Sequence, residues 1–192
     1  VGTRKPPQAG EVEIEVSAAG LNFKEVLAAA GLIPSTTPNL NFGLECTGTI
    51  VALGEGVKDF VIGDEVIAFG SACFSRFITT ADRLVAPKPA HLSLQEAATL
   101  PIAFTTAYHA LIQKGQLSKG EKVLIHAASG GVGMAAVQIA QWEGAEIFAT
   151  AGSTEKRKFL HSLGIEHVKD SRSVVYADDV MRQTNGQGVD VD

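Results

Sequence analysis

One stretch of the chain restricts the fold more than any other, because a short apolar run passes into a glycine-rich turn and then into a helix-forming segment. The stretch runs from Val123 to Gly133. Apolar residues within 122–126 predict a buried strand, and residues 131–144 predict a helix. The first turn of a helix leaves N–H groups without partners, so anions bind there readily. The stretch therefore predicts a strand–turn–helix unit that binds a phosphate group.

Each glycine of this turn has a separate physical use. Gly130 and Gly131 carry no side chains that would keep a pyrophosphate away from the backbone amides, and Gly133 permits close packing of the helix. Ala128 occupies the first glycine position of a GxGxxG pattern, so the bare pattern match is incomplete. A plain turn of small residues is the alternative. The predicted pyrophosphate-binding residues are Ser129, Gly130, Gly131, Val132 and Gly133.

Strands and helices alternate around this turn, which is typical of a parallel sheet. We expect strands at 122–126, 146–150 and 165–168, helices at 131–144, 154–164 and 174–184, and the beginning of a fourth strand at 189–192. A doubly wound dinucleotide fold needs two such halves. The second half of a Rossmann-type domain is therefore expected to be missing from these residues.

The end of the second of these strands predicts which nicotinamide nucleotide binds. A carboxylate about twenty residues after the glycines would hold an unphosphorylated ribose and repel a 2′-phosphate. Here residues 150–153 contain no acidic side chain, and basic residues follow at 156–158. Hydroxyl and cationic groups can hold a phosphate by charge-assisted hydrogen bonds. NADPH is favoured, with Ser153, Lys156 and Arg157 as candidate ligands; a solvated basic helix face is the alternative.

The first half of the chain has the pattern of a small β-barrel-like unit. In residues 11–16, apolar side chains alternate with Glu11, Glu13 and Glu15, which predicts one dry and one solvated face. Further strands are expected at 47–53, 64–69 and 74–79. A helix is expected at 23–30, with Asn22 as its N-cap and Gly31 closing its end. Ser93 begins a capping box, and a longer helix is expected from Pro101 to Lys114.

Composition excludes several classes of function. The chain is 45% hydrophobic, with a net charge of −5 and no basic stripe, which argues against a nucleic-acid partner. No apolar run reaches the length of about 18 residues that a membrane helix needs. We expect a cytoplasmic protein that acts on small molecules. Cys46 and Cys73 are too few for a disulfide framework, and both are expected to be buried thiols.

Three motifs in the first half resemble the barrel signature of medium-chain dehydrogenases and quinone reductases, namely residues 43–48, 54–57 and 63–66. In the zinc-dependent members a histidine ligand precedes the glutamate, whereas here Leu44 precedes Glu45. The histidines show no metal-ligand spacing, so no zinc is expected and structural or surface roles are assigned to them. They are His91, His109, His126, His161 and His167.

Residues 18–27, 96–108 and 126–134 resemble the enoyl reductase domains of polyketide and fatty acid synthases. This resemblance implies an α/β fold, with a GroES-like substrate domain at 1–95 and a truncated Rossmann-type domain at 96–192. It also implies hydride transfer from NADPH to the β-carbon of an enoyl thioester, followed by protonation at the α-carbon. The substrate would be carried by an acyl carrier protein among the other domains of a multidomain synthase.

The resemblance also implies roles for single residues. Asn22 and Thr105 would lie beside the nicotinamide, and Arg172 near the adenosine end. An N-cap, a back-bonded hydroxyl and a solvated arginine are the respective alternatives. Many relatives have a tyrosine where Ile33 stands in the segment from Gly31 to Pro34.

The lysine and aspartate that the family uses near the active site are expected beyond Asp192, so no catalytic residue is assigned. Lys24 is the one candidate substitute, and a solvated helix position is favoured for it.

Three other functions stay open. A quinone oxidoreductase would share the glycine turn and the absence of a zinc site. The absent tyrosine also allows an enoyl reductase variant with an unusual α-carbon outcome, such as altered stereochemistry or ring closure. Finally, the domain could bind NADPH without catalysing a reaction.

Overall fold

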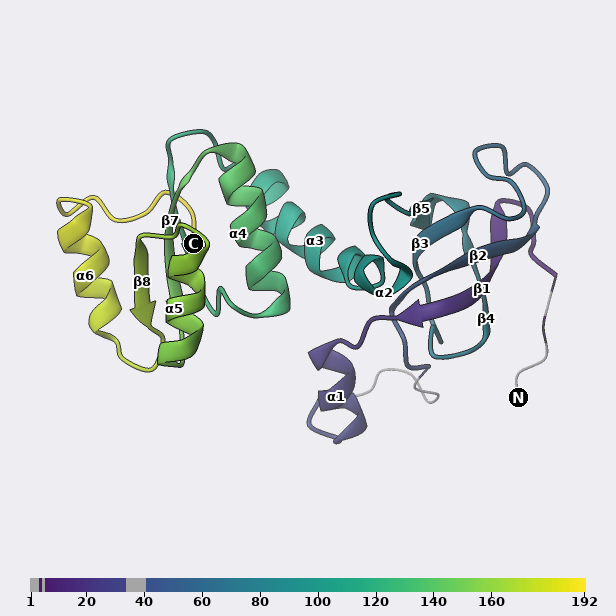
Figure 1. The fold of residues 1–192 in the computed structure, drawn as a ribbon, viewed down its shortest axis with the longest axis horizontal. Coiled ribbons are helices and arrows are strands. Elements are labelled where there is room, and N and C mark those ends of the chain that lie inside the picture. The colour runs from purple at the N-terminus through teal and green to yellow at the C-terminus, as the bar shows by residue number, and fades with distance from the viewer. Residues whose placement is uncertain (1–3, 5, 34–40) are drawn as a thin grey trace. The chain divides into compact units, whose positions relative to one another are not determined.

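The structure is a computed structural model that describes residue 4, residues 6–33 and residues 41–192. The chain forms two compact units, Val1–Ile102 and Ala103–Asp192. Each has its own core of buried apolar side chains. The two units are described separately below (Figure 1).

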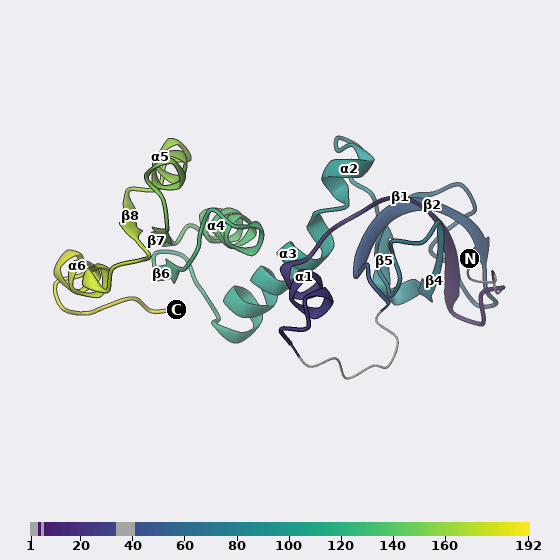
Figure 2. The same cartoon turned by 90° about the horizontal axis from the view of Figure 1, so that it is seen from below.

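The first unit is built on a five-stranded antiparallel sheet with the order β4-β1-β2-β3-β5. Figure 2 shows its strands curving around a common interior, as the predicted barrel-like unit requires. The buried side chains of this interior include Val12, Ile14, Ile50 and Val66, all 0% exposed. The strands are β1 (Glu11–Ala19), β2 (Glu45–Leu53), β3 (Glu65–Phe69), β4 (Phe77–Ala81) and β5 (Val85–Pro87).

The two cysteines belong to this core. Cys46 and Cys73 are free thiols and each is 0% exposed, so the prediction of buried thiols is confirmed. A hydrogen bond with Cys73, together with burial, raises the pKa of the Cys46 thiol. Because the thiolate is the nucleophilic form, Cys46 is held unreactive at neutral pH.

The prediction that Glu13 faces solvent is wrong. Its register with β2 is irregular between Glu13 and Ile14, and Glu13 is 4% exposed. The Arg4 guanidinium covers it with hydrogen bonds of 2.8 and 2.6 Å to the two carboxylate oxygens. Arg4 also lies over the Phe77 ring, 4.1 Å from its centroid. A buried carboxylate is tolerated here because it is paired and hydrogen-bonded.

The strand predicted at 74–79 begins later in the structure, at Phe77. Residues before Phe77 form a turn in which Ala72 has φ 64° and its carbonyl accepts a hydrogen bond from Ser75 N. The residues before Phe77, which the alternating pattern assigns to the strand, therefore belong to this turn. The 3-10 helix η1 (Asp82–Leu84) and the short strand β5 are additional to the predicted elements.

The helices around residue 100 follow the predicted pattern in part. Helix α2 (Leu94–Ala97) begins with the expected capping box of Ser93 and Glu96. Helix α3 (Leu100–Tyr108) then passes into a π-helix, η2 (His109–Lys114), in place of the single predicted α-helix. The π-helix turns Leu111 into the core of the second unit, and the sequence carries no clear signal for it. The boundary between the units falls inside α3, and the domain limits of 1–95 and 96–192 stay predictions.

The second unit contains a parallel three-stranded sheet with the order β6-β7-β8. Its strands are β6 (Lys122–Ile125), β7 (Glu146–Ala151) and β8 (His167–Asp170). Figure 2 shows α4 (Gly131–Glu143) and α5 (Thr154–Ser162) on one face of the sheet and α6 (Val175–Gln183) on the other. This is the α/β arrangement that the sequence predicts.

The predicted fourth strand appears only as a single parallel bridge between Val123 and Val191. It lies beside β6, on the side away from β7. No helix in the described ranges has both the length and the hydropathy to cross a membrane.

The Arg4–Glu13 pair provides a test of the first unit. Hydrogen bonds from Arg4 hold the pKa of the Glu13 carboxyl below its usual range. A lowered pKa contributes stability above the pKa of the unfolded carboxyl, about 4.3, and this contribution is lost as the pH falls through the folded value. We expect Arg4→Met to lower the free energy of unfolding at neutral pH, with a deficit that shrinks below about pH 4. Urea unfolding at a series of pH values measures this.

Arg76→Met is the matched control, because its ion pair with Glu15 is exposed, at 77% and 40% of the two side chains. Arg76→Met should lower the free energy of unfolding only slightly at any pH. Equal deficits for both variants that do not change with pH would contradict the account of Glu13.

Candidate functional site

The turn after β6 is held against the neighbouring strand. Ala128 N donates to the carbonyl of Thr150 on β7 at 3.0 Å, and Ala127 N donates to the Thr150 hydroxyl at 3.3 Å. Ala127 has φ 48°, a left-handed conformation that is rare outside glycine. The tight turn is therefore made at Ala127. Ala128, which replaces the expected glycine, needs no unusual conformation.

The first backbone N–H groups of α4 are available to bind a ligand; they are called the open amides below. Gly130 is the N-cap, and within the described ranges the N–H groups of Gly131, Val132 and Gly133 have no acceptor. A Cβ built on Gly131 would meet no atom within 4 Å, so open space lies beside Gly131. Ser129 is half-buried just before them. This geometry suits an anion at the positive end of a 13-residue helix.

Gly133 has a different role from Gly131. A Cβ at this position would lie 2.7 Å from Ala128 Cα. Gly133 thus lets α4 pack closely against the turn before it, in line with the predicted need for close packing at this glycine.

The end of β7 gathers polar and basic residues, and no acidic side chain lies among residues 150–153. Ser153 is the N-cap of α5, and its hydroxyl accepts from Lys156 N at 3.3 Å. The Arg172 side chain comes from the loop after β8 and borders Gly152, with Nε 3.5 Å from the position of a Cβ there. Lys156 and Arg172 are exposed. Ser153, Lys156 and Arg172 thus stand at the carboxyl end of the sheet.

Arg157 is engaged in contacts within the protein. Its Nη1 lies 3.1 Å from the Ala151 carbonyl and 3.1 Å from Asp170 Oδ2, and its Nη2 lies 3.2 Å from Thr154 Oγ1. The side chain is 23% exposed. These contacts favour a structural role for Arg157 over the predicted phosphate contact.

In the first unit, Asn22 belongs to a buried polar cluster. It precedes α1 (Phe23–Ala29), and its Nδ2 donates to Glu45 Oε1 at 2.8 Å. Asn22 N donates to Glu25 Oε2 at 3.0 Å, and Glu25 also accepts from Gly43 N. Asn22 is the N-cap of α1, as the sequence predicts, and it forms a capping box with Glu25. Gly31 does close the helix, with φ 70°.

Glu25 and Glu45 are members of this cluster that the sequence reasoning missed. They are 5% and 3% exposed. Each lies within a motif that suggests the family resemblance, and a carboxylate inside a motif of mostly apolar and small residues is the one available signal.

Thr105 lies on α3, in the second unit. Its side chain is exposed, and it makes no hydrogen bond to the preceding helical turn in the described part of the chain. The back-bonded alternative is therefore not supported. Lys24 is exposed, in agreement with a solvated position, and Ile33 is half-buried. Pro34 lies outside the described residues.

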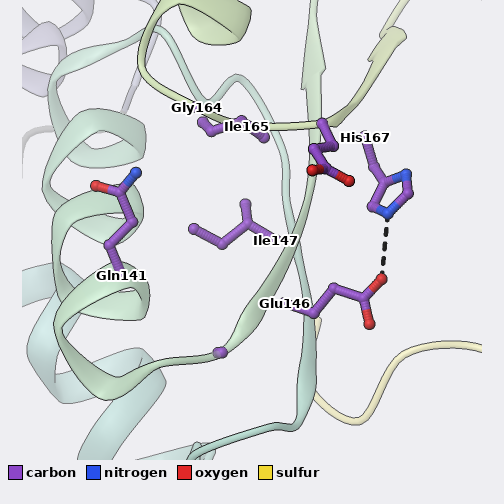
Figure 3. Close-up of a pocket in the computed structure, with 8 residues that line it drawn as sticks. Gln141, Glu146, Ile147, Gly164, Ile165 and His167 are labelled. Carbon is purple, nitrogen blue, oxygen red and sulfur yellow. Dashed lines mark hydrogen bonds and ion pairs between the residues drawn. The ribbon is translucent and has the colours of Figure 1, made fainter.

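A shallow pocket of about 340 Å³ lies at the amino ends of β7 and β8, away from the carboxyl ends where the candidate nucleotide site lies (Figure 3). Its lining includes the first residues of β7 and β8, Glu146 and His167, whose side chains are hydrogen-bonded at 3.1 Å. The His167 ring stacks on Phe148 at 4.4 Å. In open α/β sheets, ligands bind at the carboxyl ends of the strands. This pocket is therefore not the candidate nucleotide site.

Two family models match the chain. That of the alcohol dehydrogenase GroES-like domain covers residues 8–92, and that of the zinc-binding dehydrogenase covers residues 131–191. The side chains do not fit a catalytic zinc, because Leu44 precedes Glu45. The described ranges also contain no group of three His, Cys, Asp or Glu side chains able to hold a metal.

Polyketide synthases are among the relatives. A component of the phenolphthiocerol/phthiocerol polyketide synthase of Mycobacterium tuberculosis is 49% identical over 191 residues, 98% of this chain and 9% of that protein. This chain thus spans a small part of the length of that relative.

Solved structures of related proteins are also similar to this chain. The CurK enoyl reductase has a TM-score of 0.92 at 51% identity, and the CurF ER cyclopropanase from the curacin A pathway has 0.87 at 40%. Each alignment covers 98% of this chain and 59% of the other. A mycobacterial protein complexed with NADPH, Rv1454c, has a TM-score of 0.87 at 29% identity, with 98% and 60% covered. The chain therefore belongs to the medium-chain dehydrogenase/reductase superfamily, and its sequence is similar to the enoyl reductases of polyketide synthases.

Proposed function

We propose that this chain is part of an NADPH-dependent enoyl reductase that acts on a thioester carried by an acyl carrier protein in a multidomain, cytoplasmic synthase. One observation carries the proposal: in the described ranges the first amides of α4 have no acceptor and open space lies beside Gly131, in a chain that is 51% identical to an enoyl reductase. NADPH, when bound, supplies the hydride that reduces the β-carbon. The residues of this chain bind and orient it.

The pyrophosphate is assigned to the glycine turn. Free N–H groups and the helix dipole attract its charge, and the absent side chains at Gly130 and Gly131 let it approach the backbone. Ser129 borders the turn and can add a hydroxyl hydrogen bond. The nearby end of β7 then receives the adenosine ribose, as in other doubly wound folds.

The 2′-phosphate is assigned to Ser153, Lys156 and Arg172. No carboxylate in residues 150–153 would repel it, and both cations are exposed at the end of the sheet. Charge-assisted hydrogen bonds to a phosphate are stronger than neutral ones. Arg157 is the weaker candidate, because its guanidinium is already paired with Asp170.

Asn22 and Thr105 are assigned to the nicotinamide end. An amide and a hydroxyl can hydrogen-bond the carboxamide or the ribose and so determine which face of the ring is presented. The group that protonates the α-carbon is not assigned to any residue of this chain.

One observation favours a second candidate. The CurF cyclopropanase is 40% identical over the same residues, so hydride delivery on this fold is compatible with ring closure in place of α-protonation. The quinone reductase alternative is tested by the same assay.

The assay of the full-length protein separates these functions. We expect NADPH oxidation to require an enoyl thioester, and mass analysis with deuterated NADPH to show one deuterium at the β-carbon of an open-chain product. A cyclopropane product from a substrate with a γ-leaving group would identify the second candidate. Turnover of quinones alone would contradict both.

The two glycines of the turn test the pyrophosphate site as a matched pair. We expect Gly131→Ala to fold normally but to bind NADPH about tenfold more weakly, because its methyl group enters the open space and costs a charge-assisted hydrogen bond. Gly133→Ala should lower the free energy of unfolding by about 1–3 kcal/mol through overpacking against Ala128. Nucleotide titration and thermal unfolding measure the two effects. Unchanged NADPH affinity in Gly131→Ala would place the pyrophosphate elsewhere.

The basic residues test the choice of nucleotide. Lys156→Ala and Arg172→Ala should each raise the Kd for NADPH about tenfold and leave the Kd for NADH nearly unchanged, because only NADPH carries the 2′-phosphate. Lys158→Ala is the matched control, since Lys158 is exposed on the same helix. Equal weakening of both nucleotides would show that these cations do not read the 2′-phosphate.

A further inference from the structure

The Thr150 hydroxyl lies where the turn after β6 meets β7. Its oxygen is 3.3 Å from Ala127 N and 3.2 Å from His126 Nδ1. These are the two hydrogen bonds of this hydroxyl within the described ranges, and Thr150 is 0% exposed. Because a buried polar group without a partner costs free energy, it matters which atom donates in each bond.

The proton of the Thr150 hydroxyl has one acceptor among the described residues. A hydroxyl has one donor and two acceptor sites. The Ala127 N–H group is a donor, so it takes a lone pair of the hydroxyl oxygen, and the hydroxyl proton goes to His126 Nδ1. If Nδ1 carried a proton, two N–H groups would face the same oxygen and the buried hydroxyl proton would have no acceptor. His126 is therefore neutral, with its proton on Nε2.

The surroundings of the His126 ring favour the same assignment. Nε2 lies 3.7 Å from Asp192 Oδ1, which is too long for a direct hydrogen bond but places a negative charge beside this nitrogen. A nearby carboxylate favours the tautomer with the proton on the closer nitrogen. The ring also meets the Tyr176 ring of α6 edge-on, with 5.4 Å between centroids and 76° between planes. These contacts keep Nδ1 directed at Thr150.

We infer that His126 is a positioning residue for the glycine turn. Its Nδ1 accepts the hydroxyl proton of Thr150, and this turns a lone pair of the hydroxyl toward the Ala127 amide. Ala127 needs that acceptor, because its left-handed conformation, with φ 48°, is costly for a residue other than glycine. The open amides of α4 follow a few residues later. His126 thus acts on them through Thr150 and Ala127, and the inference rests on the proposed function only for the identity of the nucleotide.

Substitutions at the two positions separate this role from simple packing. His126→Asn keeps an acceptor, because the asparagine Oδ1 can take the place of Nδ1, whereas His126→Leu fills similar space without one. Thr150→Val removes the hydroxyl and with it the need for an acceptor at residue 126. The double variant His126→Leu/Thr150→Val completes a double-mutant cycle. All of these variants are made in the full-length protein.

Amide hydrogen exchange without nucleotide measures how firmly the turn is held. For the Ala127 and Ala128 amides we expect about tenfold faster exchange in His126→Leu and in Thr150→Val, the equivalent of about one lost hydrogen bond. His126→Asn should exchange nearly as slowly as the wild type. The double variant should exchange no faster than Thr150→Val, because the hydroxyl through which His126 acts is already absent. Strand β1 is the control for folding and should exchange equally in all variants.

Titration with NADPH is the second measurement. A loosely held turn presents the open amides less well, so the Kd should rise about tenfold in His126→Leu and in Thr150→Val. His126→Asn should restore the affinity, and the double variant should bind as Thr150→Val does. A group that contacts the nucleotide directly would instead give losses that add in the double variant.

Each outcome decides the inference. Unchanged exchange in His126→Leu, or exchange as fast in His126→Asn as in His126→Leu, overturns it. Additive losses in the double variant overturn it too, and so does faster exchange of β1 in His126→Leu, which would show a general packing role. A wild-type protein that does not bind NADPH overturns the proposed function, and the exchange rates, which need no nucleotide, then decide this inference separately.

Discussion

The hydrogen bonds that Thr150 makes to the turn after β6 determine where the open amides of α4 lie. Thr150 is 0% exposed in the middle of the parallel sheet, and its carbonyl and hydroxyl bind successive amides of the turn. A left-handed alanine costs roughly 1–2 kcal/mol, so Ala127 keeps this conformation only because its surroundings enforce it. The turn in turn fixes Gly133 and the first turn of α4. The candidate phosphate site is therefore a consequence of pairing between β6 and β7.

In the first unit, buried carboxylates have the corresponding role. Glu13, Glu25 and Glu45 are each no more than 5% exposed, and each accepts hydrogen bonds from groups elsewhere in the unit. Burial of a carboxylate is costly unless such partners are present. Among the described residues, no buried side-chain nitrogen or oxygen lacks a partner. Glu25 and Glu45 both bind Asn22, so the polar interior of this unit converges on a residue proposed to contact the cofactor.

The α/β order of the second unit and the glycine turn could be predicted from the sequence because they depend on local signals. Apolar runs, small residues and caps each act within a few positions. The burial of Glu13 could not be predicted, since period-two alternation cannot show that Arg4 will cover the solvated face. The contacts of Glu45 were also missed, because its partners are 23 and 57 residues away. The π-helix η2 was also missed, because its sequence carries no clear signal that separates it from a continued α-helix.

Arg157 can affect the predicted phosphate site without touching the phosphate, because it pairs with a residue that also binds the Arg172 backbone. Asp170 pairs with the Arg157 guanidinium through Oδ2 and accepts from Arg172 N through Oδ1 at 2.9 Å. Arg157 therefore joins the end of β7 to the loop after β8, and this loop carries Arg172. Loss of Arg157 would release the Arg172 backbone as well as one positive charge. Weaker NADPH binding in an Arg157 variant would thus not establish direct contact with the 2′-phosphate. The side chains of Lys156 and Arg172 take no part in this ion pair. Substitution of these two residues therefore tests direct contact with the 2′-phosphate.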